Sequence, residues 1–310
     1  MNKFLNGKMA FITPIVLFIG IYASTWIDDW TMIVPWLFMI ITFASSTKIE
    51  IPQLIKTIRK PIPILFCLVI LQVIVPAIAY IIGSVVFPND PMTLVGIVLA
   101  FILPTAIASL IWVSIYEGET SLALTIVFIN TLFAPIFIPL TLYFLFQTSV
   151  SFDLPELTIG LVQMIVIPSI LGIVVKHFTS GQFVNQQVPL DLLAKICLLT
   201  VILINGSVVA PYFIPLHWNV IIITLIILLI SMTAYVIAFT VSQLFRFSNL
   251  ERISITFCAG MRNIGVGAAL AIVYFPAEVA LPVVVGTLFQ QLLASVVGKY
   301  IISRAKKSEN

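Results

Sequence analysis

The sequence predicts an all-α membrane protein with ten transmembrane helices, and three observations predict it. Hydrophobic residues make up 61% of the 310 residues and charged residues only 9%, whereas soluble proteins carry about 25% charged residues. The apolar residues fall into ten runs, most of them near the length of about 20 residues that spans a bilayer. The basic residues gather on one side of the predicted membrane.

Short polar or proline-containing connections separate the ten apolar runs. The runs cover residues 9–26, 31–47, 62–87, 91–115, 121–147, 157–175, 192–213, 218–245, 253–275 and 278–302. Residues 50–60, between the second and third runs, predict a short amphipathic helix at the cytoplasmic surface. The first run lacks a convincing small-residue cleavage site, so we expect a retained span rather than a signal peptide.

The basic residues predict the orientation of the chain. When the connections are assigned alternately to two sides, one side receives 14 of the 15 Lys and Arg residues. The other side receives carboxylates such as Asp28, Asp29 and Asp90, and no basic residue. Because basic loops stay in the cytoplasm, we expect a multi-pass protein of a bacterial-type cell (inner) membrane, with both termini cytoplasmic.

Two of the runs are interrupted. The fourth contains Pro104-Thr105 and Ser109, and the ninth contains Arg262-Asn263 between glycines. Proline and glycine break helices, and the freed backbone groups must bond to protein or to water in a cavity. Interruptions at corresponding places in two five-span halves are typical of inverted-repeat transporters with a binding site at the membrane midplane. The halves are residues 1–152 and 153–310.

Arg262 is the fifteenth basic residue, and it lies inside the ninth run. About ten residues separate it from the cytoplasmic end, which places it roughly 15 Å deep at 1.5 Å per residue. An arginine there costs at least about 2.5 kcal/mol, so we expect a function for it rather than snorkelling to the surface. Lone Ser, Thr, Asn and Gln residues in spans more often bond helices together. Asn130 and Thr131, which share a run with Pro135 and Pro139, are the better site candidates.

Several motifs are absent, which excludes whole classes of function. The sequence contains no P-loop, no His/Cys metal cluster and no nucleophile triad. We find no Asp or Glu inside a span, so a carboxylate proton relay has no carrier. The chain is therefore not expected to be an enzyme or an ATP-driven pump, and neither a metal, a cofactor nor a nucleic-acid partner is predicted.

In two blocks the sequence resembles the bile acid:sodium symporter family, which belongs to a wider group with arsenite and auxin carriers. Residues 103–139 are similar to the family's fourth and fifth spans, with Pro104, Ala108-Ser109, Gly118 and Leu122 in register. Gly260-Met261, Asn263, Gly265 and the segment 268–271 are similar to its ninth-span motif. The resemblance implies a panel domain of spans 1, 2, 6 and 7, which moves against a core domain of spans 3–5 and 8–10. It also implies that the two broken helices cross in the core beside two sodium ions and the substrate.

The resemblance fails at most of the sodium ligands. Ser109 matches a ligand serine of the family, but the other ligand positions have changed. Leu110 replaces an asparagine, Ala123 and Val127 replace hydroxyl residues, Cys258 replaces a glutamate and Arg262 replaces a glutamine. Sodium needs several hard oxygen ligands. We therefore expect that sodium coupling has been lost and that the Arg262 guanidinium takes the place of the cation.

Together these observations predict a secondary transporter that carries a small organic anion across the lipid bilayer by alternating access. The residues expected to bind substrate are Arg262, Asn263, Thr105, Ser109, Asn130, Ser45 and Asn205. One alternative is a sodium-coupled organic anion symporter that uses other ligands, such as Gln72. A second alternative is a non-transporting ligand sensor. An arsenite carrier is disfavoured because Cys258 alone makes a poor thiolate site. Substrate, direction of transport and oligomeric state stay open.

Overall fold

The computed structural model describes residues 2–49, 57–58, 61–146, 153–179, 187–215 and 217–308. Every regular element in this part of the chain is a helix. The amphipathic helix predicted over residues 50–60 lies outside the described residues, apart from Thr57 and Ile58, which are helical.

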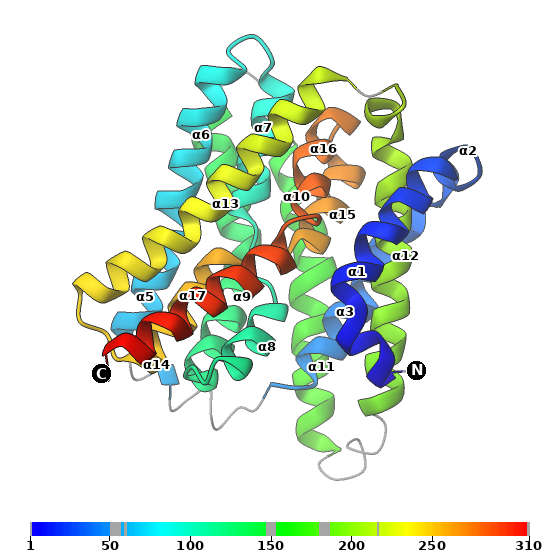
Figure 1. The fold of residues 1–310 in the computed structure, drawn as a ribbon. Coiled ribbons are helices and arrows are strands. Elements are labelled where there is room, and N and C mark those ends of the chain that lie inside the picture. Colours follow the sequence, from blue (N-terminus) through cyan, green and yellow to red (C-terminus); the bar gives the residue numbers. More distant parts are fainter. Residues whose placement is uncertain are drawn as a thin grey trace.

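The first half of the chain forms a series of helices that run up and down the bundle (Figure 1). They are α1 (Asn2–Tyr22), α2 (Ser24–Ile27), η1 (Asp28–Ile33), α3 (Val34–Ser46), α5 (Pro61–Val69), η2 (Ile70–Ile74), α6 (Val75–Val86), α7 (Pro91–Ile102), α8 (Ala108–Ile115) and α9 (Thr120–Phe146). η1 is a 3₁₀-helix, whereas η2 is a π-helical turn that joins α5 and α6 into one long helix.

The second half has the same character. It contains α10 (Leu154–Leu161), η3 (Val162–Val166), α11 (Ile167–Phe178), α12 (Gln187–Phe213), α13 (Trp218–Leu244), α14 (Asn249–Gly260), α15 (Ile264–Tyr274), α16 (Ala277–Gly286) and α17 (Gln290–Ser308). A π-helical turn, η3, joins α10 and α11. α1 begins and α17 ends at the same, lower end of the bundle in Figure 1.

Six helices of the described residues are long and apolar enough to cross a membrane. They span Pro61–Val86, Thr120–Phe146, Leu154–Phe178, Pro189–Phe213, Trp218–Leu244 and Ala277–Tyr300, and each coincides with a predicted run. The other four runs contain shorter apolar helices, Ile12–Tyr22, Trp30–Ser46, Pro91–Ile102 and Ile264–Tyr274. The last two are short because each is one half of an interrupted run. The chain is thus an all-helical, multi-pass membrane protein, and the count of ten spans stays a prediction.

Local sequence signals begin several of these helices. The Asp90 carboxylate accepts a hydrogen bond from the Thr93 N–H at 3.0 Å, and Asp153 caps α10 in the same way at 3.0 Å. Ser248 and Glu251 form a reciprocal capping box at the start of α14. Such caps satisfy N–H groups that a helix cannot bond internally, and proline stands in the first turn of both α7 and α10.

The helices pack in two groups, which Figure 1 shows side by side. In the first group α12 packs against α1 and α3, and α3 packs against α11. In the second, α16 packs on α7, α13 on α14, and α9 on α5, α7 and α8. Gly20 and Gly206 let α1 and α12 approach closely, since a Cβ at Gly20 would overlap the Leu203 carbonyl. α15 and α16 contact both groups.

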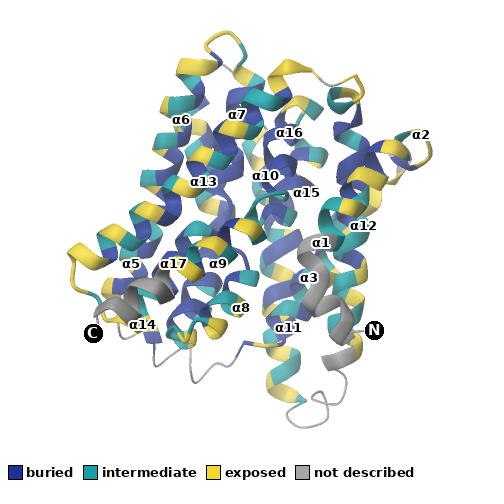
Figure 2. Ribbon diagram, viewed as in Figure 1, coloured by how far each residue is buried: buried dark blue, intermediate teal, exposed yellow. Residues whose placement is uncertain are grey.

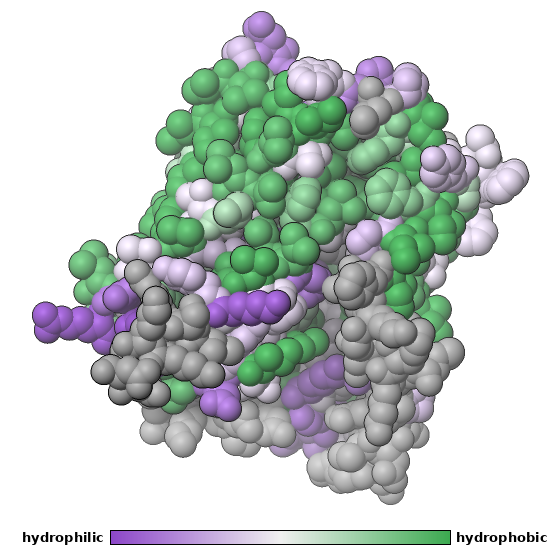
Figure 3. All heavy atoms as spheres, viewed as in Figure 1, coloured by the Kyte–Doolittle hydropathy of each residue, from purple (hydrophilic) through white to green (hydrophobic). Residues whose placement is uncertain are grey.

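Many large apolar residues are exposed on the outside of the bundle, and the buried residues lie between the helices (Figure 2). Along α13, Leu225, Leu229, Met232 and Val236 are exposed at a spacing of three or four residues, so they form one outward stripe. On the face drawn in Figure 3 the upper part is a broad green, apolar area, and purple, hydrophilic residues lie at the top and across the lower half. A surface of this kind is suited to lipid rather than to water.

Candidate functional site

The breaks in the two interrupted helices lie against each other. α7 ends at Ile102 and α14 ends at Gly260, and a short extended segment follows each. The Asn263 N–H donates to the Pro104 carbonyl at 2.7 Å, and the Ala106 N–H donates to the Met261 carbonyl at 3.2 Å. Thr105 thereby pairs antiparallel with Arg262. Each break satisfies backbone groups that the other has freed, as a non-helical backbone inside a membrane requires.

Two side-chain features hold the breaks together. The Thr105 hydroxyl lies 2.5 Å from the Cys258 carbonyl oxygen and 3.1 Å from that of Met261, so it bonds the carbonyls at the end of α14. Gly267 gives Leu103 its space, because a Cβ at position 267 would come within 2.1 Å of a Leu103 methyl carbon. The local sequence therefore specifies both the breaks and their contact.

The Arg262 side chain bonds the C-terminal ends of two helices. Its Nε donates to the Phe101 carbonyl at 3.0 Å, and its Nη1 donates to the Ala259 carbonyl at 2.6 Å. These carbonyls belong to the last turns of α7 and α14, where helices leave acceptors unbonded and the helix dipole is negative. The side chain is 4% exposed, and no carboxylate pairs with it among the described residues. Main-chain carbonyl groups therefore take the place of a counter-ion for the buried charge of Arg262.

A small cavity lies beside this arginine, between α7, α13, α16 and α17. Arg262, Ser231, Tyr235 and Gln290 supply its polar side chains. The Gln290 side-chain oxygen accepts the Arg262 backbone N–H at 3.1 Å. Arg262 Nη2 and the Tyr235 hydroxyl are buried without a hydrogen-bond partner among the described groups.

A larger cavity lies on the other side of the breaks, where the two helix groups meet. It is enclosed by α3, α8, α9, α15 and the η3–α11 helix, and its volume is about 50 Å³. A cavity of that size holds a few water molecules, so it must widen before an organic molecule fits. Its polar lining consists of Thr42, Ser45, Ser46, Lys48, Thr131, Ser169 and Asn263. The rest of the lining is apolar and includes Phe38, Phe128 and Val266.

The structure distributes the predicted substrate residues over several places. Asn263 and Ser45 line the larger cavity, whereas Arg262 lines the smaller one. Thr105 and Ser109 are fully buried at the breaks. Asn130 is buried as well.

Two buried amides lie apart from both cavities. Asn130 accepts a hydrogen bond from Gln72 Nε2 at 2.6 Å, which leaves the Gln72 oxygen without a partner among the described groups. Asn205 lies on α12, 1% exposed, and neither of its amide atoms has a described partner.

Two of the positions where the sequence departs from sodium ligands, Ala123 and Cys258, meet beside Ser109. Ser109 Oγ lies 3.8 Å from Cys258 Sγ, and the Cys258 thiol lies 3.9 Å from the Ala123 carbonyl oxygen. Leu110 and Val127 line the larger cavity instead. Ser109 supplies the one side-chain oxygen of this set, and the described residues contain no cluster of His, Cys, Asp or Glu that could hold a metal ion.

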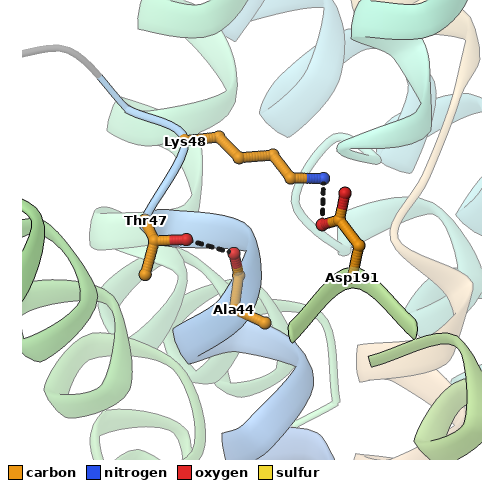
Figure 4. A network of polar contacts seen from close by, with 4 residues as sticks. All are labelled: Ala44, Thr47, Lys48 and Asp191. Atoms are coloured by element: carbon orange, nitrogen blue, oxygen red, sulfur yellow. Dashed lines mark hydrogen bonds and ion pairs between the residues drawn. The ribbon is translucent and has the colours of Figure 1, made fainter. Parts of the chain in front are cut away.

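Sequence reasoning missed Lys48, which ends the turn after α3. Its ammonium lies 2.8 Å from an Asp191 carboxylate oxygen, and Thr47 bonds the Ala44 carbonyl at 2.7 Å where the helix ends (Figure 4). Lys176 donates to the Lys48 carbonyl at 3.3 Å. In the sequence, Lys48 is one of the 14 basic residues that predict the orientation of the chain. Its position three residues after Ser45 was the signal that could have placed it at the cavity.

Sequence reasoning also missed Tyr235, which lies in the middle of the apolar α13. A tyrosine in such a run usually packs against neighbouring helices, and nothing in the sequence indicates that Tyr235 lies near Arg262. Gln290 is a polar residue within the tenth apolar run, and its bond to the Arg262 backbone depends on the turn between α16 and α17.

Comparison with known proteins agrees with a transporter. The chain is 36% identical over 299 residues to YbaS, an uncharacterized protein of Bacillus subtilis (strain 168). The aligned region covers 96% of this chain and 97% of the relative. Over 286 residues it is 24% identical to YocS of the same organism, described as an uncharacterized sodium-dependent transporter, covering 92% and 87%. The sequence profile of one transporter family matches residues 10–307. The chain therefore belongs to the SBF-like CPA transporter family (DUF4137).

Proposed function

We propose that the protein is a secondary transporter that moves a small organic anion by alternating access. One observation carries the proposal, the polar-lined cavity of about 50 Å³ between the two helix groups, beside the paired breaks. A site at such a boundary becomes accessible from either side when one group moves against the other. The group of α1, α3, α11 and α12 corresponds to the panel of spans 1, 2, 6 and 7, and the second group to the core of spans 3–5 and 8–10.

The wider architecture belongs to the same proposal. We infer ten spans in two inverted repeats, residues 1–152 and 153–310, with both termini in the cytoplasm of a bacterial-type cell. The start of α1 and the end of α17 at one end of the bundle support an even number of crossings. Cysteine labelling from outside at Asp29 and Asp90, with tags at both termini, tests this topology.

The chemistry of the larger cavity favours an organic anion. Ile107 and Leu110 bring the N-terminus of α8 to the cavity wall, and Asn263 and Val266 bring the N-terminus of α15. Helix N-termini carry partial positive charge and favour anions. Phe38 and Phe128 suit an apolar body, while Ser45 and Thr131 offer hydroxyl groups. The substrate class therefore combines an acidic group with an apolar skeleton.

Arg262 takes the place of a bound cation in this proposal. Its guanidinium reaches main-chain carbonyls of both half-helices, at 3.0 Å for Phe101 and 2.6 Å for Ala259. A sodium ion at the same helix ends would also draw on carbonyl oxygens. Cys258 and Ala123 offer no side-chain oxygen, which supports transport without sodium. Arg262 thus acts on the substrate indirectly, by holding the breaks and their helix ends in place.

A sodium-coupled symporter is the second candidate, and one observation favours it. The relative YocS is described as sodium-dependent, at 24% identity. In this chain the Gln72 side-chain oxygen is buried and has no hydrogen-bond partner among the described groups. It lies in the π-helical turn η2, a type of distortion that is frequent at functional sites. Under this alternative Gln72 and nearby carbonyls would hold the ion.

Uptake into proteoliposomes tests the proposal and separates the two candidates. We expect saturable uptake of at least one carboxylate from a panel of labelled organic anions, with equal rates in Na⁺, K⁺ and choline media. Uptake that needs a sodium gradient would favour the symporter. A protein that takes up none of the anions under any gradient, although it is folded and correctly inserted, would contradict anion transport itself.

A further inference from the structure

The larger cavity contains one feature that its helix ends do not explain, a lysine. Lys48 lines the cavity and is also 51% exposed, so the cavity reaches the surface at this residue. Among the described residues that line the cavity it is the only cation. Its ammonium group ends a flexible four-carbon stem and carries three donors, so it can turn either toward the cavity or away from it.

Asp191 pairs with this ammonium group. The two side chains form an ion pair at 2.8 Å, and Asp191 lies in the first turns of α12, 28% exposed (Figure 4). Lys195, one turn further along α12, interacts electrostatically with both Asp191 and Lys48. Lys176 donates to the Lys48 carbonyl. We call these four residues the Lys48 cluster. With three lysines and one carboxylate, the cluster carries a positive charge.

The ion pair is of a kind that exchanges partners easily. Both partners are partly exposed, and pairs of this kind contribute little because water competes for each charge. An anion in the cavity would meet a lysine that loses little when it leaves Asp191. It would also be drawn toward the cluster by the surplus of positive charge.

We propose that Lys48 is the residue that binds the acidic group of the substrate and that Asp191 is its built-in competitor. The inference rests on the proposed function and sharpens it. The acidic group lies at the cavity mouth against Lys48, and the apolar skeleton lies deeper, near Phe38 and Phe128. Arg262 does not bind this group, because its guanidinium bonds two carbonyls and lines the other cavity.

A double-mutant cycle on purified protein tests this assignment. The variants are Lys48→Met, Asp191→Asn and the two combined, in phosphatidylcholine nanodiscs so that no anionic lipid headgroup competes. The probes are benzoate, 2-naphthoate and cholate, each beside its neutral amide, and apparent affinity is measured by thermal stabilisation and by competition. Lys176→Met is the matched control, because it removes one charge of the Lys48 cluster at a residue that does not line the cavity and that bonds the main-chain carbonyl of Lys48.

Asp191→Asn is expected to tighten carboxylate binding by up to about fivefold, the range of an exposed ion pair. Lys48→Met should weaken it about tenfold and remove the preference for the carboxylate over its amide. Because Asp191 acts through Lys48, Asp191→Asn should have no effect in the Lys48→Met background. Lys48→Arg should restore most of the affinity, and Lys176→Met should change it less than Lys48→Met.

Three outcomes contradict parts of this picture in different ways. Carboxylate binding that Lys48→Met leaves unchanged overturns the assignment of Lys48 but leaves anion transport standing. An Asp191→Asn gain that persists in the Lys48→Met background means that Asp191 repels anions generally and is not a competitor for Lys48. If no probe binds any variant, while uptake assays also detect no anion, the proposed function fails and this inference fails with it.

Discussion

The two sides of the paired breaks differ in charge, although both consist of helix ends. On one side the C-termini of α7 and α14 present carbonyl groups, and Arg262 covers them with a fixed guanidinium. On the other side the N-termini of α8 and α15 face the larger cavity, of about 50 Å³. Breaking a helix creates a negative end and a positive end together. The protein supplies its own cation for the negative ends, whereas the positive ends face the cavity.

The largest effect is expected from removing the fixed cation. Arg262→Ala leaves the Phe101 and Ala259 carbonyls without their charged donor, and each such bond contributes about 1.5–3 kcal/mol. We expect transport to be lost and the free energy of unfolding to fall by several kcal/mol. Arg262→Lys should restore part of the stability, because a point charge lacks the planar fork that reaches both carbonyls. Uptake assays and chemical denaturation measure the two effects, and normal transport by Arg262→Ala would make the arginine dispensable.

A second experiment replaces the Arg262 guanidinium by a bound sodium ion. The combined change Leu110→Asn, Ala123→Ser, Val127→Thr, Cys258→Glu and Arg262→Gln restores oxygen ligands, so sodium should stabilise this variant and potassium should not. An ion at 100 times its dissociation constant adds about 2.7 kcal/mol to stability, which a thermal melt detects.

Its control is Cys258→Glu alone, which retains Arg262. We expect no sodium response there, because the guanidinium already neutralises the new carboxylate. Strong, saturable stabilisation of the unmodified protein by Na⁺ but not by K⁺ would contradict the replacement of sodium by Arg262.

The fit between the breaks themselves can be tested with two glycines of α15. Gly267→Ala places a methyl group 2.1 Å from a Leu103 side-chain atom, whereas the nearest contact at Gly265→Ala is 3.2 Å, to the Phe38 ring. Overpacking of this kind costs about 1–3 kcal/mol. We therefore expect a clear drop in melting temperature for Gly267→Ala and a smaller one for Gly265→Ala. Equal melting temperatures would mean that Leu103 can move aside.

The smallest effect on stability is expected from a substitution at the N-terminus of α15, one of the two positive helix ends at the larger cavity. Asn263 caps α15 by accepting the Val266 N–H at 3.5 Å and also lines the larger cavity. Asn263→Ala should cost about 0.5–1 kcal/mol of stability, at the low end for a lost cap, and should weaken substrate binding. Asp153→Ala removes the cap of α10, far from the cavity, and should lower stability without changing uptake. If both variants transport like the unmodified protein, Asn263 is a cap and nothing more.

The helices and their interruptions were predictable because apolar runs mark the helices, and clusters of proline and glycine mark the breaks. Each of the ten apolar runs contains a helix of the described chain, and both breaks fall at the proline and glycine clusters. The side to which each break residue points was not predictable. Arg262 and Asn263 are neighbours and were assigned to one site, but the segment between α14 and α15 is extended, and successive side chains of an extended segment point to opposite faces. Arg262 therefore lines one cavity and Asn263 the other.

The hydrogen bonds between the breaks also affect how the backbone exchanges its protons with solvent. Non-helical segments normally exchange their amide hydrogens fast because they open locally at little cost. Here the Ala106 and Asn263 amides are bonded across the breaks, at 3.2 and 2.7 Å, and so belong to the packed interior. They should exchange as slowly as the centres of long helices, so the two interrupted helices would open as one unit. Any increase in amide hydrogen exchange during transport would then be greatest where α3 and α12 meet α15.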